Sequence, residues 1–330
     1  MMDRRRFLFG SLLTPLTGTL AGCSSDSRDD RSAYRGTPEA KVAILGQASY
    51  AEPLVDTILQ GIRLFRLNVH GKKVLLKPNL VEFDPAGVIN TNPAVVAATI
   101  EAFRRLGARE VLVGDGSGHR RDNEYLLQAS GLQAVLQDHR IRYVDLNTDD
   151  VRPLALRTGF TRLPRLYFPE TVLTADLVVS MPKLKTHHWA GVTLSMKNMF
   201  GVIPGSIYGW PKNVLHWAGI DESIVDINST LTMPRFAIVD GIVGMEGDGP
   251  IRGTPRHTGI LIFGEDLVAV DATAARCMMI DPARIPYLRM AGDFLGHLDH
   301  KRITQVGEPV AGVAQDFQVT AGFRHLKAGA

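Results

Sequence analysis

The chain has 330 residues, with 37 Lys and Arg against 34 Asp and Glu, a formal net charge of +3 and 45% hydrophobic residues. This balance excludes a disordered, highly charged chain and gives no electrostatic footprint for nucleic acid. Because Cys23 and Cys277 are the only cysteines, it also excludes a disulfide framework, a cysteine-rich zinc site and a cysteine-ligated iron–sulfur cluster.

The first 22 residues are typical of an export signal. Arg4-Arg5-Arg6-Phe7-Leu8 fits the twin-arginine pattern, and the apolar run of residues 7–20 is too short to span a bilayer. Leu20-Ala21-Gly22-Cys23 looks like a lipoprotein cleavage box, in which the Cys23 thiol is lipidated. We therefore expect a signal peptide for the twin-arginine export machinery. The mature protein would be a membrane-anchored lipoprotein facing the periplasm or the cell exterior. An uncleaved anchor and ordinary secretion are the alternatives.

The rest of the chain divides into a tether and a folded part. Residues 23–38 are small, polar and charged, which favours a flexible tether between lipid and domain. Removal of residues 1–22 takes away three arginines and one aspartate, which leaves a formal charge of +1. Residues 39–330 are long enough for a large core, either as a single α/β domain or as two closely packed lobes.

Short apolar segments alternate with segments of helical spacing along residues 39–330. The expected strands are 42–45, 74–76, 110–113, 142–146, 177–180, 236–239 and 259–263. The expected helices are 53–68, 93–106, 123–130, 193–200, 221–231 and 266–280, with Asp221 and Asp266 as N-caps. This alternation predicts an α/β fold, with a mainly parallel sheet and helices on both faces. Ligands of such sheets bind beyond the carboxyl ends of the strands.

Four expected strands end in segments that carry chemically active side chains, and two of these segments are short. Lys77, stiffened by Pro78 and followed by Asn79, can direct an ammonium group at an anion or extend along the sheet edge into solvent. Gly114-Asp115-Gly116-Ser117-Gly118 is a tight turn or, on a weaker signal, a phosphate cradle. In either case Asp115 places an acid at the end of a strand.

The third segment, residues 181–201, mixes basic groups with apolar side chains. The basic and amide residues are Lys183, Lys185, His187, His188, Lys197 and Asn198, and they lie among Trp189, Leu194 and Phe200. His216 follows, beside Trp217. Basic groups held against apolar ones tend to have perturbed pKa values, and such groups cluster at functional sites. We therefore predict the site here, with a solvated basic loop as the alternative.

Acidic residues mark the remaining segments. Asp240, Glu246 and Asp248 lie on a glycine-rich stretch that could hold a hard cation or form a solvated polar turn. Asp271 lies inside an apolar helix, where a buried acid needs a lysine partner or a favourable position in the helix dipole. Cys277 is expected to be a buried, small apolar residue.

Six motifs occur in order and resemble one known family. They are K-P-N at Lys77, G-D-G-S-G at Gly114, P-K-L-K-T-H at Pro182, M-K-N-M-F-G at Met196, the segment 240–250 and A-V-D-A around Asp271. This order resembles the family catalogued as domain of unknown function 362, whose name supplies no reaction. Many of its members carry ferredoxin-type iron–sulfur modules, for which this chain has no cysteines.

The segment from His187 to Gly205 is also similar to nickel-pincer lactate racemases. In those enzymes a lysine ten residues after a histidine carries the cofactor, and Lys197 stands ten residues after His187. The resemblance implies Lys197 as the cofactor-bearing residue, His187 as an acid or base, and His216 as a metal-ligand position. It also places Lys77 where the racemases bind substrate with an arginine. Leu194-Ser195-Met196 differ from the racemase pattern of glycines and a basic residue.

Together these patterns predict an enzyme for a small anionic, hydroxy-acid-like substrate, with isomerase-, racemase- or oxidoreductase-like chemistry. The predicted catalytic residues are Lys197, His187 as general base, Asp115 and Asp271. The predicted substrate-binding residues are Lys77, Asn79, Lys183, Lys185 and Asn198. The predicted metal-binding residues are His216, Asp240 and Glu246, with a metal or a Lys-linked group as cofactor. The alternative function is a non-catalytic lipoprotein that binds an anion or a metal.

Overall fold

The computed structural model describes residues 34, 38–118, 122–327 and 329. The expected signal peptide, the lipidation position Cys23 and most of the expected tether lie outside the described residues.

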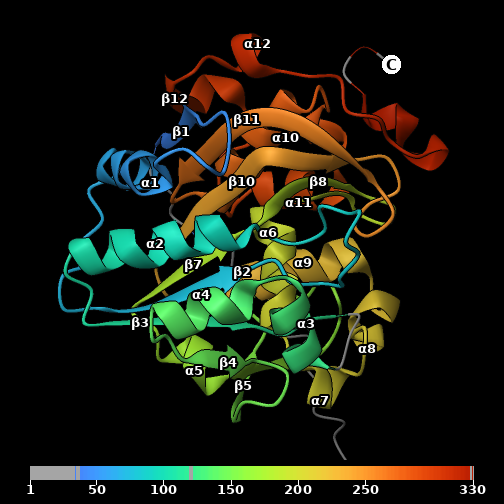
Figure 1. Ribbon diagram of the computed structural model, residues 1–330. Helices are drawn as coiled ribbons and strands as arrows, with labels where there is room; N and C mark the ends of the chain where they lie inside the picture. The colour runs from blue at the N-terminus through green and yellow to red at the C-terminus, as the bar shows by residue number, and fades with distance from the viewer. Residues whose placement is uncertain (1–33, 35–37, 119–121, 328, 330) are drawn as a thin grey trace, which may run out of the picture.

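A ten-stranded sheet forms the centre of the fold (Figure 1). Its main path runs through β12 (Ile303–Gly307), β1 (Ala40–Gly46), β11 (Thr254–Gly264), β10 (Arg235–Glu246), β7 (Leu177–Met181), β2 (Lys73–Pro78), β3 (Glu110–Asp115) and β4 (Tyr143–Asp145). β11 is antiparallel to both of its neighbours, and the other pairings along this path are parallel. The expected α/β class with a mainly parallel sheet is confirmed.

Two smaller strand pairs complete the β structure. β8 (Lys183–His187) pairs in parallel with β10 and antiparallel with β9 (Gly191–Thr193), so both belong to the main sheet. β5 (Val151–Ala155) and β6 (Arg165–Pro169) form a separate antiparallel pair.

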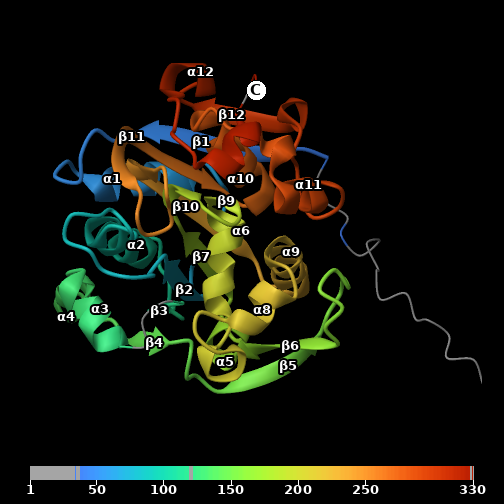
Figure 2. The same cartoon turned by 90° about the vertical axis from the view of Figure 1, so that its right-hand side faces the viewer.

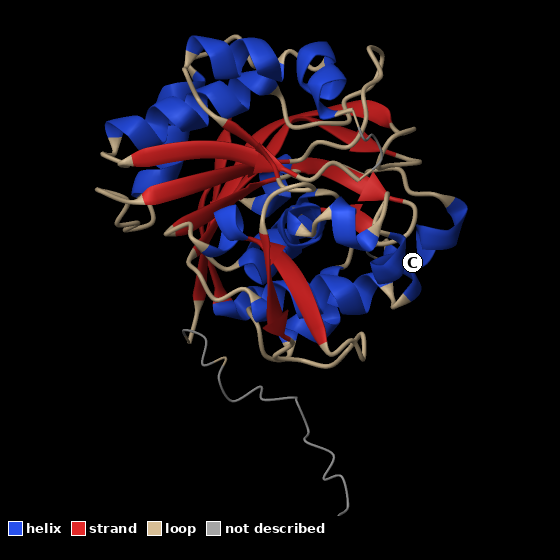
Figure 3. Cartoon of the chain, turned by 90° about the horizontal axis from the view of Figure 1, so that it is seen from below, coloured by secondary structure: helices blue, strands red, loops and turns tan. Residues whose placement is uncertain are grey.

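Helices cover both faces of the sheet, as Figure 2 shows from the side and Figure 3 from below. One face carries α1 (Leu54–Arg63), α2 (Pro93–Arg105), α3 (Asn123–Ala129) and α4 (Leu132–Asp138). The other carries α6 (Ser195–Asn198), α9 (Ile220–Thr230), α10 (Leu267–Cys277) and α11 (Pro286–Gly292). Shorter elements are α5 (Glu170–Leu173), α7 (Gly205–Tyr208), α8 (Asn213–Trp217), α12 (Val310–Val313), and the 3₁₀ helices η2 (Met199–Val202), η3 (Pro282–Arg284), η4 (His300–Arg302) and η5 (Ala321–Leu326).

Alternation along the strands produces the two cores. In β2, Val74 and Leu76 pack with the side chains of α1 and α2, whereas Leu75 packs on the opposite face with those of α9 and α10. Successive side chains of a strand point to opposite faces, so a continuous apolar run fills both cores at once. The fully apolar sequence of the central strands therefore explains the helical layer on each side.

Of the two expected N-caps, Asp266 and Asp221, only Asp266 is confirmed. Asp266 caps α10, because its side chain accepts a hydrogen bond from the Ala269 amide at 3.0 Å. Asp221 does not cap α9. The helix begins one residue earlier, after Gly219 with a φ of 105°, and Asp221 therefore lies in its first turn.

Other segments also differ from the sequence-based expectations. α1 ends at Arg63, short of residue 68, and the α-helix expected over 193–200 is reduced to α6 followed by η2. Residues 183–187, expected as a loop, form β8. β10 continues through Glu246, although glycines interrupt its sequence. In both segments, pairing with neighbouring strands satisfies the backbone hydrogen-bonding groups. The strands therefore continue through the lysines of β8 and the glycines of β10.

Candidate functional site

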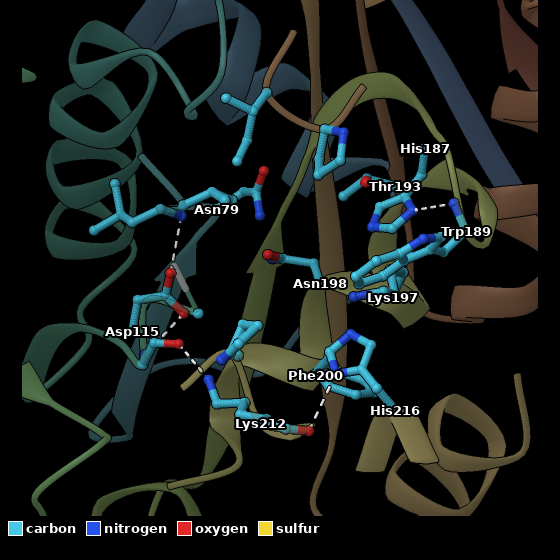
Figure 4. A pocket seen from close by; sticks show the side chains of 18 of the residues that line it. Asn79, Asp115, His187, Trp189, Thr193, Lys197, Asn198, Phe200, Lys212 and His216 are labelled. Atoms are coloured by element: carbon cyan, nitrogen blue, oxygen red, sulfur yellow. Dashed lines mark hydrogen bonds between the residues drawn. The ribbon is translucent and has the colours of Figure 1, made fainter. Parts of the chain in front are cut away.

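The neighbouring parallel strands β7, β2 and β3 end at the same edge of the sheet, level with Asp240 in the middle of β10. A cavity of about 260 Å³ lies at this edge. It is lined by Lys77, Asn79, Leu80, Val81, Asp115, Gly116, Gly118, His187, His188, Trp189, Thr193, Lys197, Asn198, Phe200, Gly201, Pro211, Lys212, His216, Pro250 and Ile251. Figure 4 shows the polar side chains of this set facing one another from separate elements. Seven of the predicted site residues are therefore brought together: Lys77, Asn79, Asp115, His187, Lys197, Asn198 and His216.

Lys77 and Asp115 form a buried ion pair in the floor of the cavity. The Lys77 Nζ lies 2.5 Å from Asp115 Oδ1 and also donates to Asn198 Oδ1 at 3.1 Å. The other carboxylate oxygen accepts from the Leu80 amide at 2.8 Å. Burial lowers the pKa of Lys77, and the charge of Asp115 opposes that shift. The positive charge of Lys77 thus already has its partner within the protein.

Gly201 allows this pair to form where η2 crosses the end of β3. The Gly116 amide donates to the Gly201 carbonyl at 2.9 Å, which fixes the two segments against each other. A Cβ atom at Gly201 would overlap Asp115 Oδ1 and lie 2.5 Å from Lys77 Nζ. The glycine after Phe200 is therefore required by close approach to the ion pair.

Lys197 differs from Lys77 because its charge has no partner in the part of the chain that the structure describes. Its Nζ lies 4.2 Å from the centroid of the Phe200 ring, in cation–π geometry, and makes no hydrogen bond or ion pair there. Burial, and then the nearby charge of Lys77, lower the pKa of Lys197 to about 8, and the charge of Asp221 opposes this shift. At neutral pH this side chain is a charged donor that faces the cavity.

Lys212 is a site residue that the sequence did not indicate. It precedes α8 with φ 69° and ψ 48°, and its Nζ donates to the Gly116 carbonyl at 2.5 Å. Burial lowers the pKa of Lys212 to about 7, although the charge of Asp115 opposes the shift. Its neighbours Pro211 and Asn213 are typical of an exposed turn, so no local pattern distinguished it from a surface lysine.

Hydrogen bonds assign opposite roles to the two histidines of the cavity. His187 Nδ1 accepts from the amides of Trp189 at 3.0 Å and Ala190 at 3.2 Å, so its ring proton lies on Nε2. His216 Nδ1 lies 3.1 Å from the Lys212 carbonyl, which can only accept, so its proton lies on Nδ1 and Nε2 keeps a lone pair. Burial lowers the pKa of both rings, with a further contribution from Lys197. His187 is therefore a donor and His216 an acceptor at neutral pH.

Two predicted substrate-binding lysines lie outside this cavity. Lys183 Nζ is 2.6 Å from Asp240 Oδ2 and 3.0 Å from the Tyr50 hydroxyl, beside a separate cavity of about 180 Å³. Lys185 Nζ donates to the Ile89 carbonyl at 2.7 Å, and burial lowers its pKa well below the usual value. Hydrogen bonds to Asp240 and to the Ile89 carbonyl hold these two ammonium groups apart from the residues that line the Lys197 cavity.

Asp271 lies beneath α6 rather than in the cavity. Its two oxygens accept from the amides of Ser195 at 2.6 Å and Met196 at 2.9 Å. The expectation of a lysine partner is therefore wrong, since backbone donors at the start of α6 take that place. Burial raises the pKa of Asp271 to about 7 despite these hydrogen bonds. Asp271 positions the turn that carries Lys197.

The residues predicted to bind a metal do not meet. Asp240 is paired with Lys183, and Glu246 Oε2 accepts from the Gln318 amide at 2.9 Å. His216 lies in the cavity with neither of them. No group of three or more His, Cys, Asp or Glu side chains that could hold a metal ion occurs within residues 38–118 and 122–327. These donors do not fit a metal centre built from protein side chains.

Comparison with known proteins places this arrangement in a family. A family model described as "Domain of unknown function (DUF362)" matches residues 74–276, a range that contains every lysine and histidine of the cavity discussed above. A thylakoid-associated protein of Synechocystis sp. is 30% identical over 230 residues, which make up 66% of this chain and 66% of that protein. The structure of the lactate racemase apoprotein from Thermoanaerobacterium thermosaccharolyticum matches with a TM-score of 0.43 and 15% identity, over 65% of this chain and 54% of that one. Since the family model spans more than half of the sequence, the protein belongs to the DUF362 family.

Proposed function

We propose that this protein is an enzyme whose cavity binds a small carboxylate, such as a 2-hydroxy acid, and removes a proton from it. The Lys197 ammonium carries the proposal. It faces the cavity and forms no ion pair with any described residue, although the charge of Asp221 lies near it, whereas Lys77 is paired with Asp115. A bound carboxylate would supply the missing negative charge through a charge-assisted hydrogen bond.

His216 is the group that we propose as general base, in place of His187. The Nδ1 proton of His216 is held by the Lys212 carbonyl, so the lone pair of Nε2 is available to take the proton from C2 of the substrate. The lowered pKa keeps the ring neutral at pH 7. The electron pair of the broken C2–H bond would delocalise onto the carboxylate oxygens, where the Lys197 ammonium stabilises it, until a proton returns to C2 on either face. His187, as a donor through Nε2, would orient the substrate.

If the mature protein carries a covalently attached cofactor, we propose Lys197 as its attachment point, and the cofactor would then take the place of the free ammonium. A lysine amine whose pKa is lowered toward neutrality is more nucleophilic at pH 7 than an exposed one. Intact-mass and peptide analysis of protein purified from its own host tests this point. An added mass on the peptide that contains Lys197 would support this attachment, and an unmodified peptide would contradict it.

The activity test uses a 2-hydroxy acid labelled with deuterium at C2. We expect the full-length protein to exchange the label or invert the configuration, as followed by NMR and chiral chromatography. Lys197→Met and His216→Gln should each lower the rate about 100-fold or more. Lys301→Met, at an exposed lysine of η4, is the matched control and should leave the rate unchanged. Tight binding without any change in the acid would favour the non-catalytic anion-binding alternative.

We also propose that the protein is exported and held at a membrane through lipidated Cys23. The sequence Arg4 to Cys23 supports this, and a relative bears the name of a thylakoid-associated protein. In the part of the chain that the structure describes, no helix is long and apolar enough to cross a bilayer. A lipid on Cys23 would provide attachment without such a helix.

Metabolic labelling with a fatty-acid analogue, followed by membrane fractionation, tests the anchor. We expect the wild type to carry label and sediment with membranes, and Cys23→Ser to lose the label. Replacement of Arg4 and Arg5 by lysine should block export if the twin-arginine route is used. Label that persists in Cys23→Ser would contradict the anchor.

A further inference from the structure

We propose that the substrate of this cavity is a carboxylate that carries an aromatic or similarly large apolar group, rather than a three-carbon acid. The inference rests on the proposed function for the anionic end of the substrate. It adds the chemical class of the rest of the substrate molecule.

The size of the cavity is the first observation. Its volume of about 260 Å³ equals the space of about nine water molecules in the liquid. A three-carbon hydroxy acid would fill only part of it and leave water against apolar walls. Because the hydrophobic contribution to binding scales with the apolar area removed from water, such a ligand would gain little from those walls.

The composition of the walls is the second observation. Side chains without charge or hydrogen-bonding groups form much of the lining: Leu80, Val81, Phe200, Pro211, Pro250 and Ile251. Trp189 also lines the cavity, and 56% of its surface is exposed. A half-exposed indole at a cavity wall is apolar surface that a bound ligand can cover.

Contacts between rings connect the Lys197 ammonium to the apolar wall of the cavity, so one ligand could reach both. The Lys197 ammonium lies 4.2 Å from the Phe200 centroid, and the rings of Phe200 and His216 are 5.1 Å apart. The Trp189 ring follows at 5.2 Å from His216, with an interplanar angle of 69°. A carboxylate held at Lys197 would leave the rest of the ligand beside His216 and Trp189, which Figure 4 shows on the same side of the cavity as Lys197.

Binding of three probes to the full-length protein in detergent tests the inference. They are lactate, 3-phenyllactate and the neutral 3-phenylpropane-1,2-diol, measured by isothermal titration calorimetry at pH 7. We expect 3-phenyllactate to bind at least about tenfold more tightly than lactate, since aromatic contact and apolar burial add to the ion pair. Trp189→Ala should remove this advantage, so that 3-phenyllactate binds no more tightly than lactate. Trp217→Ala, at a tryptophan that is 81% exposed and does not line the cavity, is the matched control and should bind all three probes as the wild type does.

The possible failures are distinguishable. Equal affinity for lactate and 3-phenyllactate, or an advantage that survives in Trp189→Ala, overturns the inference and leaves the proposed anion site intact. If neither acid binds, or if the neutral diol binds as tightly as 3-phenyllactate, the proposed function fails together with it.

Discussion

The ammonium of Lys77 lies 2.5 Å from the carboxylate of Asp115, and the two side chains are 1% and 2% exposed. These residues come from neighbouring strands, β2 and β3, and close the floor of the cavity that Lys197 and His216 face. The charges of this pair cancel at one end of the cavity. The ammonium of Lys197, on α6, is therefore the group that attracts an anion.

Breaking this pair from one side should destabilise the fold. Lys77→Met would leave the Asp115 carboxylate buried without its counter-charge, which typically costs about 3–5 kcal/mol of unfolding free energy. The double variant Lys77→Met with Asp115→Asn removes both charges and should recover part of that loss. Urea denaturation of the single and double variants measures the effect. Costs that simply add would show that the two groups are not coupled.

Anion binding should weaken as pH rises through the pKa of Lys197. Only the charged amine pairs with a carboxylate, and burial lowers the pKa of Lys197 to about 8. Affinity for 3-phenyllactate should therefore fall about tenfold for each pH unit above that value, until only the neutral form remains. Titration calorimetry between pH 6 and pH 10 follows the change.

Lysine variants identify the group responsible. Lys197→Met should bind weakly at every pH and lose this dependence. Lys212→Met removes the second lysine, whose pKa is about 7, and should retain the fall above pH 8. A dependence that persists in Lys197→Met would assign the binding charge to another residue.

Asp271 should make stability depend on pH in the acidic range. Its pKa is raised to about 7, so the folded protein binds this proton more tightly than the unfolded chain does. The contribution of this group to stability is therefore greatest below about pH 4 and is lost as pH rises toward 7. Asp271→Asn cannot ionise but keeps one acceptor for the amides of Ser195 and Met196.

The variant should flatten the stability profile between pH 4 and pH 7, at a cost of about 1 kcal/mol at the acidic end for the lost acceptor. Urea titrations of the wild type and Asp271→Asn at pH 4.5 and pH 7 provide the comparison. Equal slopes for the two proteins would mean that Asp271 does not change its protonation in this range.

Gly201→Ala should disturb the cavity floor. The added methyl group meets both members of the Lys77–Asp115 pair, and overpacking of this kind typically costs about 1–3 kcal/mol. Loss of 3-phenyllactate binding should accompany the loss in thermal stability. Gly322→Ala, where no atom lies within 4 Å of the new Cβ, is the control and should change stability by less than about 0.5 kcal/mol. Wild-type binding by Gly201→Ala would contradict the role of this close contact.

Much of the site location could be predicted from the sequence, because it depends on where apolar runs end. Lys77 and Asp115 directly follow such runs, and parallel strands bring their ends to one edge. The partners of each charged group could not be predicted in this way. Lys183 and Lys197 look alike as basic residues among apolar ones, yet β8 presents one to Asp240 and α6 presents the other to the cavity.

The chain alone determined the layered α/β architecture, since the spacing of apolar residues is a local property that records which faces are buried. Val74, Leu75 and Leu76 already require cover on both sides of their strand. Only the tertiary structure decided that Lys212 joins the cavity, that His216 rather than His187 keeps a free lone pair, and that backbone amides satisfy Asp271. Those outcomes depend on turn geometry or on hydrogen bonds between groups far apart in the chain. Neither produces a periodic pattern in the sequence that could predict them.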